Sequence, residues 1–363
     1  MKKTVVLLAA ILVVVLAATI SFSGCVQAQK AEETKAAEVI GEAAYDYYEM
    51  LREVAKKGEA YPDAPAAGKT LAFTNIMGGI PFCESVWSDV QKQWALAGGA
   101  PGDLYYADNQ YDATIGLKNA DIMLAKSPDV LINFQFDAKV NSIIATKFGQ
   151  AGIPIIAVDV PTPGAPFMGV NNFYVSYLGG EYAVAAVEAM GGIDMLDAIV
   201  LMQFPAGGDI LMLRSEGFYQ AFVDKYGAEK IDPITYRADG GAGEAEQANK
   251  AMTDILSTIP DAQYVAMTSI NEQTMSGCIA AIQTAGRWDP EKWFIVTMGC
   301  DDVGKQQIRD GLTDGSVAFF PERYGEYLVP AAVALMMGQI VPPFLYVENV
   351  VINKDNIDEW YPE

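Results

Sequence analysis

The sequence predicts an α/β protein in which parallel sheets are covered by helices on both faces. From residue 69 onward, short apolar runs of strand length alternate with longer stretches of helical character. This alternation is typical of strand–helix–strand units, whose strands run parallel and are buried on both sides. The chain of 363 residues is also long enough for two domains of about 100 to 200 residues each.

The apolar runs are predicted to be buried strands at residues 70–75, 130–133, 153–158, 198–203, 264–268 and 294–299. Helices are expected, among others, at residues 85–97, 113–125, 139–149, 176–190 and 272–285. Ligands of open parallel sheets bind beyond the carboxyl ends of the strands. The residues directly after each strand are therefore the first candidates for a site.

The N-terminus, residues 1–24, has the pattern of an export signal. Two Lys residues precede an uncharged apolar run over residues 5–20, and small residues follow it. The run is short for a bilayer-spanning helix, which needs about 20 apolar residues. Ser23-Gly24-Cys25 resembles the end of a bacterial lipobox, with Phe22 where Leu is usual. We expect Cys25 to carry lipid and anchor the exported protein to a membrane; an uncleaved N-terminal anchor is the alternative.

Residues 25–68 are predicted to form a helical spacer and linker. Residues 31–57 are rich in Ala, Glu and Lys, with apolar residues close to helical spacing. The Pro-rich stretch 61–68 then indicates a linker. The spacer separates lipid from domain or packs on a lobe, and a partner-binding helix is the other interpretation.

The composition argues against several classes of protein. A net charge of −22 repels phosphate backbones, so we expect no nucleic-acid partner. The chain has no His, which removes Ser-His-Asp and Cys-His catalysis and the commonest zinc ligand. Cys83, Cys278 and Cys300 follow Cys25 without metal-like spacing. We therefore expect no enzyme activity, no metal and no cofactor.

Polar residues recur at the predicted strand ends, at Asn75, Asn133, Asp159, Asn271 and Asp301. Carboxylates and amides form hydrogen bonds with hydroxyl groups, and aromatic residues beside them cover apolar ring faces. This mixture suits an uncharged polyol. Asp and Asn are also favoured as helix caps whatever the function, which is the simpler interpretation for Asp137 and Asp302. A carboxylate pair such as Asp159 and Asp301 keeps glycoside hydrolysis open as an alternative.

A series of motifs from about residue 69 to residue 352 resembles the periplasmic sugar-binding proteins of the ribose/galactose type. These are cluster B substrate-binding proteins of ABC importers. In chain order the motifs are Ile80-Pro81-Phe82, Val158-Asp159, Gly169-Val170-Asn171-Asn172, Tyr177-Leu178-Gly179-Gly180, Arg214-Ser215-Glu216-Gly217-Phe218, Asn271-Glu272, Gln283-Thr284-Ala285-Gly286, Gly299-Cys300-Asp301 and Pro321-Glu322-Arg323-Tyr324-Gly325.

The resemblance implies the type I periplasmic binding protein fold, with two Rossmann-like lobes joined by a three-crossing hinge. Lobe one would comprise residues 69–170 plus 321–341, and lobe two residues 171–319 plus 343–363. The crossings would fall near residues 169–171, 319–321 and 341–343.

The resemblance also implies the ligand-binding residues. Phe82 would stack on the sugar, Asn133 and Asp159 would meet its hydroxyls from lobe one, and Asn75 would line the floor. Lobe two would contribute Arg214, Asn271 and Asp301.

Four positions depart from the family pattern. Val160 stands where Arg is frequent, and Cys83 where a second aromatic residue often follows Phe82. Ile80 and Phe319 stand where ribose binders have Asn and Gln. Cys83 and Phe319 are therefore included among the predicted ligand-binding residues.

These changes make the predicted pocket less polar than a ribose site. Phe134, Phe136 and Phe204 either pack in the core or restore an aromatic surface to the pocket. A hexose, a deoxy sugar, a polyol or another small polar solute such as a nucleoside is compatible with the residues.

The resemblance implies an extracytoplasmic, membrane-anchored lipoprotein that captures a sugar-like solute and delivers it to ABC permease subunits. We expect a monomer. A sensory binding protein for a chemoreceptor or sensor kinase is the alternative, because both roles use the same lobes. We do not expect a lactose-repressor-like transcription factor, because a signal and spacer occupy the place of its DNA-binding segment.

Overall fold

The computed structural model describes residues 42–362. The predicted signal segment, Cys25 and the first part of the predicted spacer lie outside this range. Among the residues described, no helix combines the length and the apolar character that crossing a membrane requires.

The first sheet is parallel throughout and has the strand order β11-β5-β4-β3-β1-β2. Its strands are β1 (Leu71–Asn75), β2 (Leu104–Asp108), β3 (Val130–Asn133), β4 (Ile155–Val158), β5 (Phe167–Gly169) and β11 (Phe344–Tyr346). β1, β3 and β4 are buried along their whole length, as continuous apolar runs require in a sheet covered on both faces.

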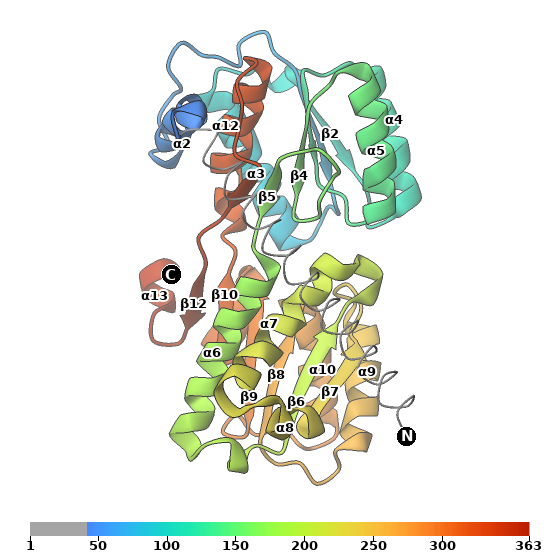
Figure 1. Cartoon of the computed structure of the whole chain (residues 1–363), viewed down its shortest axis with the longest axis vertical. Helices are drawn as coiled ribbons and strands as arrows, with labels where there is room; N and C mark the ends of the chain where they lie inside the picture. The colour runs from blue at the N-terminus through green and yellow to red at the C-terminus, as the bar shows by residue number, and fades with distance from the viewer. Residues whose placement is uncertain (1–41, 363) are drawn as a thin grey trace, which may run out of the picture. The chain divides into compact units, whose positions relative to one another are not determined.

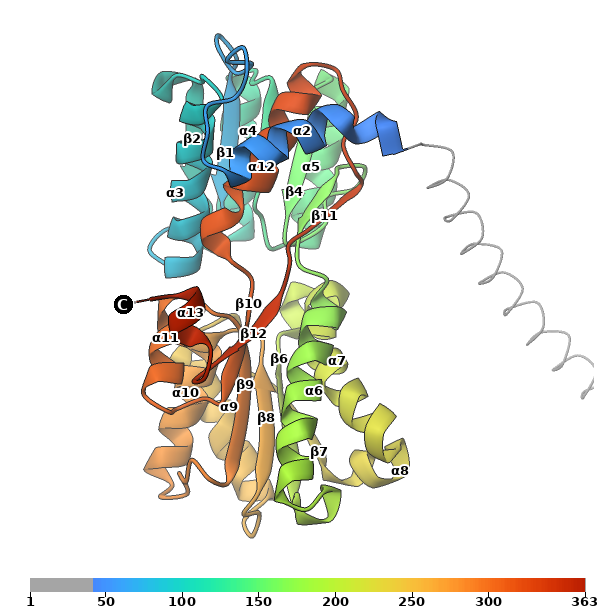
Figure 2. The same ribbon diagram turned by 90° about the vertical axis from the view of Figure 1, so that its left-hand side faces the viewer.

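Helices cover both faces of this sheet, and together they form lobe one (Figures 1 and 2). α4 (Ala113–Ala125) and α5 (Ala138–Ala151) contact each other on one face, and α3 (Pro81–Leu96) and α12 (Gly325–Met336) contact each other on the other. Ile144 and Phe148 of α5 belong to a buried core cluster with strand residues of the sheet.

The second sheet has the order β12-β10-β9-β8-β6-β7. Its strands are β6 (Ala198–Gln203), β7 (Thr235–Asp239), β8 (Val265–Ser269), β9 (Trp293–Gly299), β10 (Gly315–Ala318) and β12 (Val350–Asn353). All pairs are parallel except β10 with β12, which is antiparallel. The expectation of parallel sheets therefore holds apart from this edge strand.

Helices on the second sheet complete lobe two (Figures 1 and 2). α6 (Asn172–Met190) and α7 (Asp209–Tyr226) pack together on one face, and α9 (Ala245–Thr258) and α10 (Glu272–Thr284) on the other. The close approach of α6 and α7 needs glycine, because a Cβ on Gly217 would lie 2.1 Å from the Phe173 carbonyl oxygen. α11 (Asp302–Arg309) follows β9.

The remaining helical elements are short. They are η1 (Glu42–Tyr45), η2 (Pro101–Asp103), η3 (Ile193–Met195), η4 (Pro205–Gly207), α8 (Ala228–Ile231), η5 (Asp232–Ile234), η6 (Pro321–Arg323) and α13 (Ile357–Trp360).

The chain passes between the two sheets three times. It leaves β5 at Gly169 for α6, leaves β10 at Ala318 for η6, and leaves β11 at Tyr346 for β12. The third crossing lies later in the chain than expected, because the sequence analysis placed it near residues 341–343. Phe344–Tyr346 pairs with β5 and extends the sheet of lobe one, so this crossing lies at residues 347–349.

The chain ahead of lobe one packs on that lobe from Tyr48 onward. Tyr48 and Leu51 of α2 (Asp46–Lys56) are buried. The Tyr61 amide donates to the Leu96 carbonyl at 2.8 Å, and its hydroxyl donates to Gln93 at 3.0 Å. Residues 48–68, expected to belong to a spacer, are therefore a structural part of lobe one.

Candidate functional site

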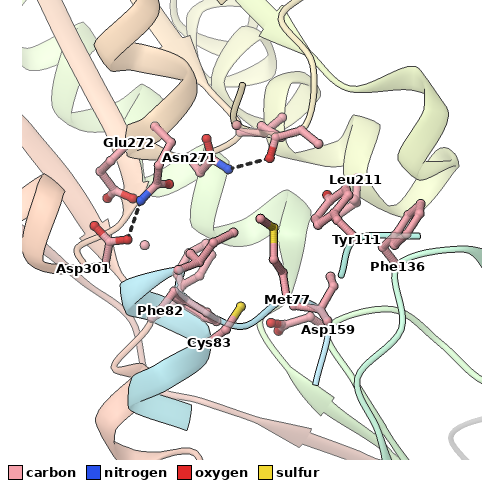
Figure 3. A pocket seen from close by; sticks show the side chains of 18 of the residues that line it. Met77, Phe82, Cys83, Tyr111, Phe136, Asp159, Leu211, Asn271, Glu272 and Asp301 are labelled. Carbon is pink, nitrogen blue, oxygen red and sulfur yellow. Dashed lines mark hydrogen bonds between the residues drawn. The ribbon is translucent and has the colours of Figure 1, made fainter. Parts of the chain in front are cut away.

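A cavity of about 290 Å³ lies between the two lobes. Its lining comes from segments that follow strand ends in both sheets, the place where open parallel sheets bind ligands. Asp159 follows β4 in lobe one, whereas Asn271 follows β8 and Asp301 follows β9 in lobe two. Figure 3 shows these three side chains around the cavity. Its volume is at the lower end of the range for small-molecule sites.

Asp159 is the carboxylate that lobe one presents to the cavity. Its backbone is left-handed, with φ of 55°, and the side chain is 6 % exposed. The Tyr324 hydroxyl donates to its Oδ1 at 3.1 Å. Burial raises the pKa of Asp159 to about 6, while Arg214 and the Tyr324 hydrogen bond act in the opposite direction. A Cβ on Gly169 would lie 2.5 Å from Oδ1, so only glycine fits there.

Arg214 of α7 lines the cavity from lobe two. Its Nε donates to Asn172 Oδ1 at 2.6 Å, and Nη1 donates to the Ile270 carbonyl at 3.2 Å. The guanidinium carbon lies 5.1 Å from the centre of the Phe319 ring, a cation–π contact. These contacts hold the guanidinium at the cavity. Because an Arg side chain carries five N–H donors, some of them remain available to a solute.

Asn271 and Asp301 line the cavity and also cap helices. Asn271 Oδ1 accepts from the Thr274 amide of α10 at 2.9 Å, and its Nδ2 donates to the Ala242 carbonyl. Asp301 Oδ1 accepts from two amides at the start of α11, and Oδ2 accepts from Gln273 at 2.7 Å. Asn271 and Asp301 are thus both predicted binding residues and the N-caps of α10 and α11. Asp137 is the N-cap of α5, as its simpler interpretation stated. At α11 the cap is Asp301, not Asp302.

Glu272 is a second buried carboxylate in the lining that the sequence analysis did not select. Its Oε1 accepts from the Cys300 amide at 2.6 Å and from the Ser316 hydroxyl at 2.7 Å. Burial and the neighbouring Asp301 raise its pKa to about 8, against these hydrogen bonds. Glu272 directly follows Asn271 in the Asn271-Glu272 motif, and this position next to a predicted binding residue could have identified it from the sequence.

Phe82 lies at the start of α3, half-buried, among other aromatic rings. It meets Phe319 edge to face at 6.2 Å between ring centres and Tyr324 at 5.6 Å. Phe82 and Phe319, both predicted, therefore form one aromatic group in the lining. Cys83 also lines the cavity, and burial raises the pKa of its thiol.

Another part of the lining is apolar. The Tyr111 ring stacks on Phe136, with ring centres 4.5 Å apart. Tyr111 belongs to lobe one but packs against a cluster of Phe204, Leu211 and Ile270 in lobe two. Tyr111 and Leu211 were not selected from the sequence. The sequence left the roles of Phe134, Phe136 and Phe204 undecided. Phe134 and Phe136 line the cavity, and Phe204 packs in the cluster with Leu211 and Ile270.

Two predicted residues do not line the cavity, which is a correction. Asn133 is fully buried, accepting a hydrogen bond from Thr74 and donating to Asn141 and Thr162. Asn75 is also fully buried and donates to the Tyr106 hydroxyl. Both amides end interior strands and serve the polar interior of lobe one.

The lining suits binding of an uncharged polar solute. It combines carboxylates, amides and a guanidinium with aromatic faces. Among residues 42–362, no group of three or more His, Cys, Asp or Glu side chains is arranged to hold a metal ion.

Comparison with known proteins agrees with this architecture. A family model described as "Periplasmic binding protein domain" matches residues 71–340. A search of curated proteins found no match.

Among solved structures, an ABC transporter periplasmic solute binding protein from Actinobacillus succinogenes with bound D-allose is 20% identical, with a TM-score of 0.67. The alignment covers 80% of this chain and 99% of that one. An ABC transporter solute binding protein from Mycobacterium smegmatis with bound glycerol is 22% identical over 80% and 96% of the two chains, with a TM-score of 0.68. A Bacillus halodurans solute binding protein with bound myo-inositol is 18% identical over 81% and 98%, with a TM-score of 0.67. At these identities the likeness shows the fold.

Proposed function

Since the chain belongs to the periplasmic binding protein domain family, we propose that it captures a small sugar or polyol between its lobes and delivers it to an ABC importer. The observation that carries the proposal is the inter-lobe cavity, into which both lobes send hydrogen-bonding groups and aromatic rings. The similar solved structures are solute binding proteins with D-allose, glycerol and myo-inositol bound, which supports the same class of ligand.

The proposed binding residues are Phe82, Cys83, Asp159, Arg214, Asn271, Asp301 and Phe319, all of which line the cavity. We add Glu272, Gln273 and Tyr111 from the structure. Asp159 and Arg214 hold the solute from opposite lobes, and Phe82 covers an apolar ring face.

The division of the site between lobes supports a capture mechanism. A solute that touches Asp159 and Asp301 at once gains both contacts only when the lobes are together. Its binding free energy therefore favours the closed arrangement over an open one. The closed lobes are the form that a transporter would recognise, and no covalent step is required.

The proposal places the protein outside the cytoplasm, as a monomer held to the membrane by lipid on Cys25. Replacement of Cys25 by Ser is expected to release the protein from the membrane fraction of the cells that express it. Retained membrane association after detergent-free fractionation would favour an uncleaved N-terminal anchor.

A thermal-shift screen of the purified protein tests the binding function. The panel contains pentoses, hexoses, polyols, nucleosides and amino acids. A solute that binds only the folded state raises the melting temperature by mass action. A shift with sugars or polyols supports the proposal. A shift confined to nucleosides or amino acids would keep the two-lobe binder and overturn the sugar assignment.

A sensory role is the second candidate, because a chemoreceptor or sensor kinase would recognise the same closed lobes. Uptake of the labelled solute by cells with and without the protein separates the two. Loss of uptake on deletion supports transport, whereas unchanged uptake with loss of the cellular response supports sensing.

A further inference from the structure

The cavity has an apolar side and a polar side. Figure 3 shows Tyr111, Phe136 and Leu211 gathered on one side of it and Glu272 and Asp301 on the other. The apolar side joins both lobes, because Tyr111 stacks on Phe136 in lobe one and packs against the cluster that contains Leu211 in lobe two. A group of the solute that lies there meets mainly ring faces and aliphatic carbon; the Tyr111 hydroxyl is the one polar group among these three side chains.

On the polar side, several hydrogen-bonding groups are already engaged with the protein. Gln273 donates to Asp301 Oδ2, and Asn271 bonds both to the Ala242 carbonyl and to the Thr274 amide. Glu272 accepts from Cys300 and Ser316. Their oxygen atoms can still accept a further hydrogen bond from a solute, but these side chains lie on one side of the cavity only.

Asp159 has the free capacity that a solute needs. Its Oδ1 accepts from Tyr324, and its Oδ2 receives no hydrogen bond from residues 42–362. The side chain is 6 % exposed and lines the cavity. Arg214 retains N–H donors beyond those given to Asn172 and Ile270. A hydroxyl or a pair of neighbouring hydroxyls on the solute satisfies both residues.

Two amide side chains that were expected to bind further hydroxyls, those of Asn75 and Asn133, do not line the cavity. Both are fully buried; the Asn133 amide bonds to Asn141 and Thr162, and the Asn75 Nδ2 donates to the Tyr106 hydroxyl. Ile80 and Phe134 line the cavity instead. A fully hydroxylated sugar would therefore turn some hydroxyls toward apolar side chains without a partner, which weakens binding.

We propose that the solute is amphipathic: a sugar or cyclic polyol that carries a methyl group in place of a hydroxymethyl group, or an apolar group on one of its hydroxyl oxygens. Its hydroxyls bind Asp159, Arg214 and the Asp301 side of the cavity, and its apolar group lies against Tyr111, Phe136 and Leu211. This inference rests on the proposed function and narrows its substrate class.

Matched ligand pairs test the inference by titration calorimetry on the purified protein. Suitable pairs are D-galactose with D-fucose, L-mannose with L-rhamnose, and methyl with phenyl glucosides. In at least one pair the less polar member is expected to bind about 10-fold more tightly or better, within the range by which an apolar pocket discriminates one methylene or one hydroxyl. Equal or tighter binding of the more polar member in every pair that binds would overturn the inference and leave the proposed function intact. No binding by any sugar or polyol would overturn both.

Variants of the apolar side provide the second arm. Leu211→Asn and, independently, Phe136→Asn are expected to abolish the preference for the less polar member. Phe344→Asn is the matched control, because Phe344 is an exposed aromatic residue on β11 outside the cavity, and it is expected to keep the preference. An undiminished preference in a folded Leu211→Asn or Phe136→Asn protein would overturn the assignment of this side.

Discussion

The Tyr324 hydroxyl donates a hydrogen bond of 3.1 Å to Oδ1 of Asp159, across 165 positions of sequence. Tyr324 directly follows η6, where the chain has just re-entered lobe one, and Asp159 directly follows β4. The bond turns one carboxylate oxygen toward the protein and leaves the other for the cavity. A residue beside the second crossing thus orients a proposed ligand-binding group.

Replacement of Asp159 by Asn is expected to weaken solute binding by about 2–5 kcal/mol, because Arg214 then lacks a charged counterpart in a buried site. Titration calorimetry with a solute identified in the screen measures the loss. Asp121→Asn is the matched control, since Asp121 is an exposed partner of Lys147 on the surface. Equal affinities of the Asp159 variant and the wild-type protein would contradict the assignment.

The affinity is expected to depend on pH through Asp159. Burial raises the pKa of this carboxyl from 3.8 to about 6. Above pH 6 the carboxylate is charged and accepts strong hydrogen bonds on both oxygens; as the pH falls through 6 it becomes protonated, loses its charge and keeps only weaker acceptor capacity. The wild-type affinity should therefore fall between pH 7 and 5, whereas the Asp159→Asn affinity stays flat. A flat wild-type profile would exclude a role for this titration.

Replacement of Arg214 by Ala should weaken binding sharply while the fold persists, because its N–H donors face the cavity from lobe two. Arg214→Lys keeps the charge but loses the fork that reaches Asn172 and Ile270, so it should restore only part of the affinity. Circular dichroism checks the fold, and calorimetry the affinity. Full affinity in Arg214→Ala would place the solute elsewhere.

The effect of Glu272→Gln on the free energy of unfolding is expected to depend on pH. The variant should be more favourable, compared with the wild-type protein, at pH 8 than at pH 5. Burial raises the pKa of Glu272 from 4.5 to about 8, so the folded state binds an extra proton between these values. Stability is retained below pH 4.5 and falls as the pH rises toward 8, by up to about 1.4 kcal/mol per pH unit. Gln removes this dependence.

Melting temperatures of the wild-type protein and Glu272→Gln at pH 5 and pH 8 measure the effect. The wild-type value should fall further between the two than the variant's. Identical falls in both proteins would show that Glu272 does not titrate as described.

Deletion of residues 1–68 should destabilise lobe one, because Tyr48, Leu51 and Tyr61 are buried. Each large apolar side chain removed from its site costs about 1.5–3 kcal/mol. A chain that begins at residue 42 is the control and keeps these contacts. The melting temperatures of the two proteins, measured by calorimetry, test this prediction. Equal melting temperatures would show that residues 48–68 do not stabilise lobe one and act only as a linker.

Much of the fold was predictable because the interior strands are continuous apolar runs. β1, β3, β6 and β9 lie close to the predicted ranges, and the family resemblance is confirmed by the model that matches residues 71–340. The edge strands β2 and β7 were not selected, since they are only partly buried and carry Tyr, Arg and Asp. β11 could not be assigned to lobe one, because three residues do not specify which sheet they join.

The candidate site was predictable where a residue follows a strand and faces the cleft. Asp159, Asn271 and Asp301 satisfy both conditions and line the cavity. Asn133 also ends a strand, but its side chain points into the interior, and residue type alone does not give that direction. Tyr111 was missed because its place in the lining depends on contacts distant in sequence, with Phe136 in lobe one and with the Leu211 cluster in lobe two.

A crystal structure of the protein with its best solute bound tests the central claim most directly. Density for the solute is expected in the inter-lobe cavity, with hydroxyls within hydrogen-bonding distance of Asp159 and Arg214 and a ring face against Phe82. Solute density outside this cavity, with the cavity filled by water alone, would contradict it.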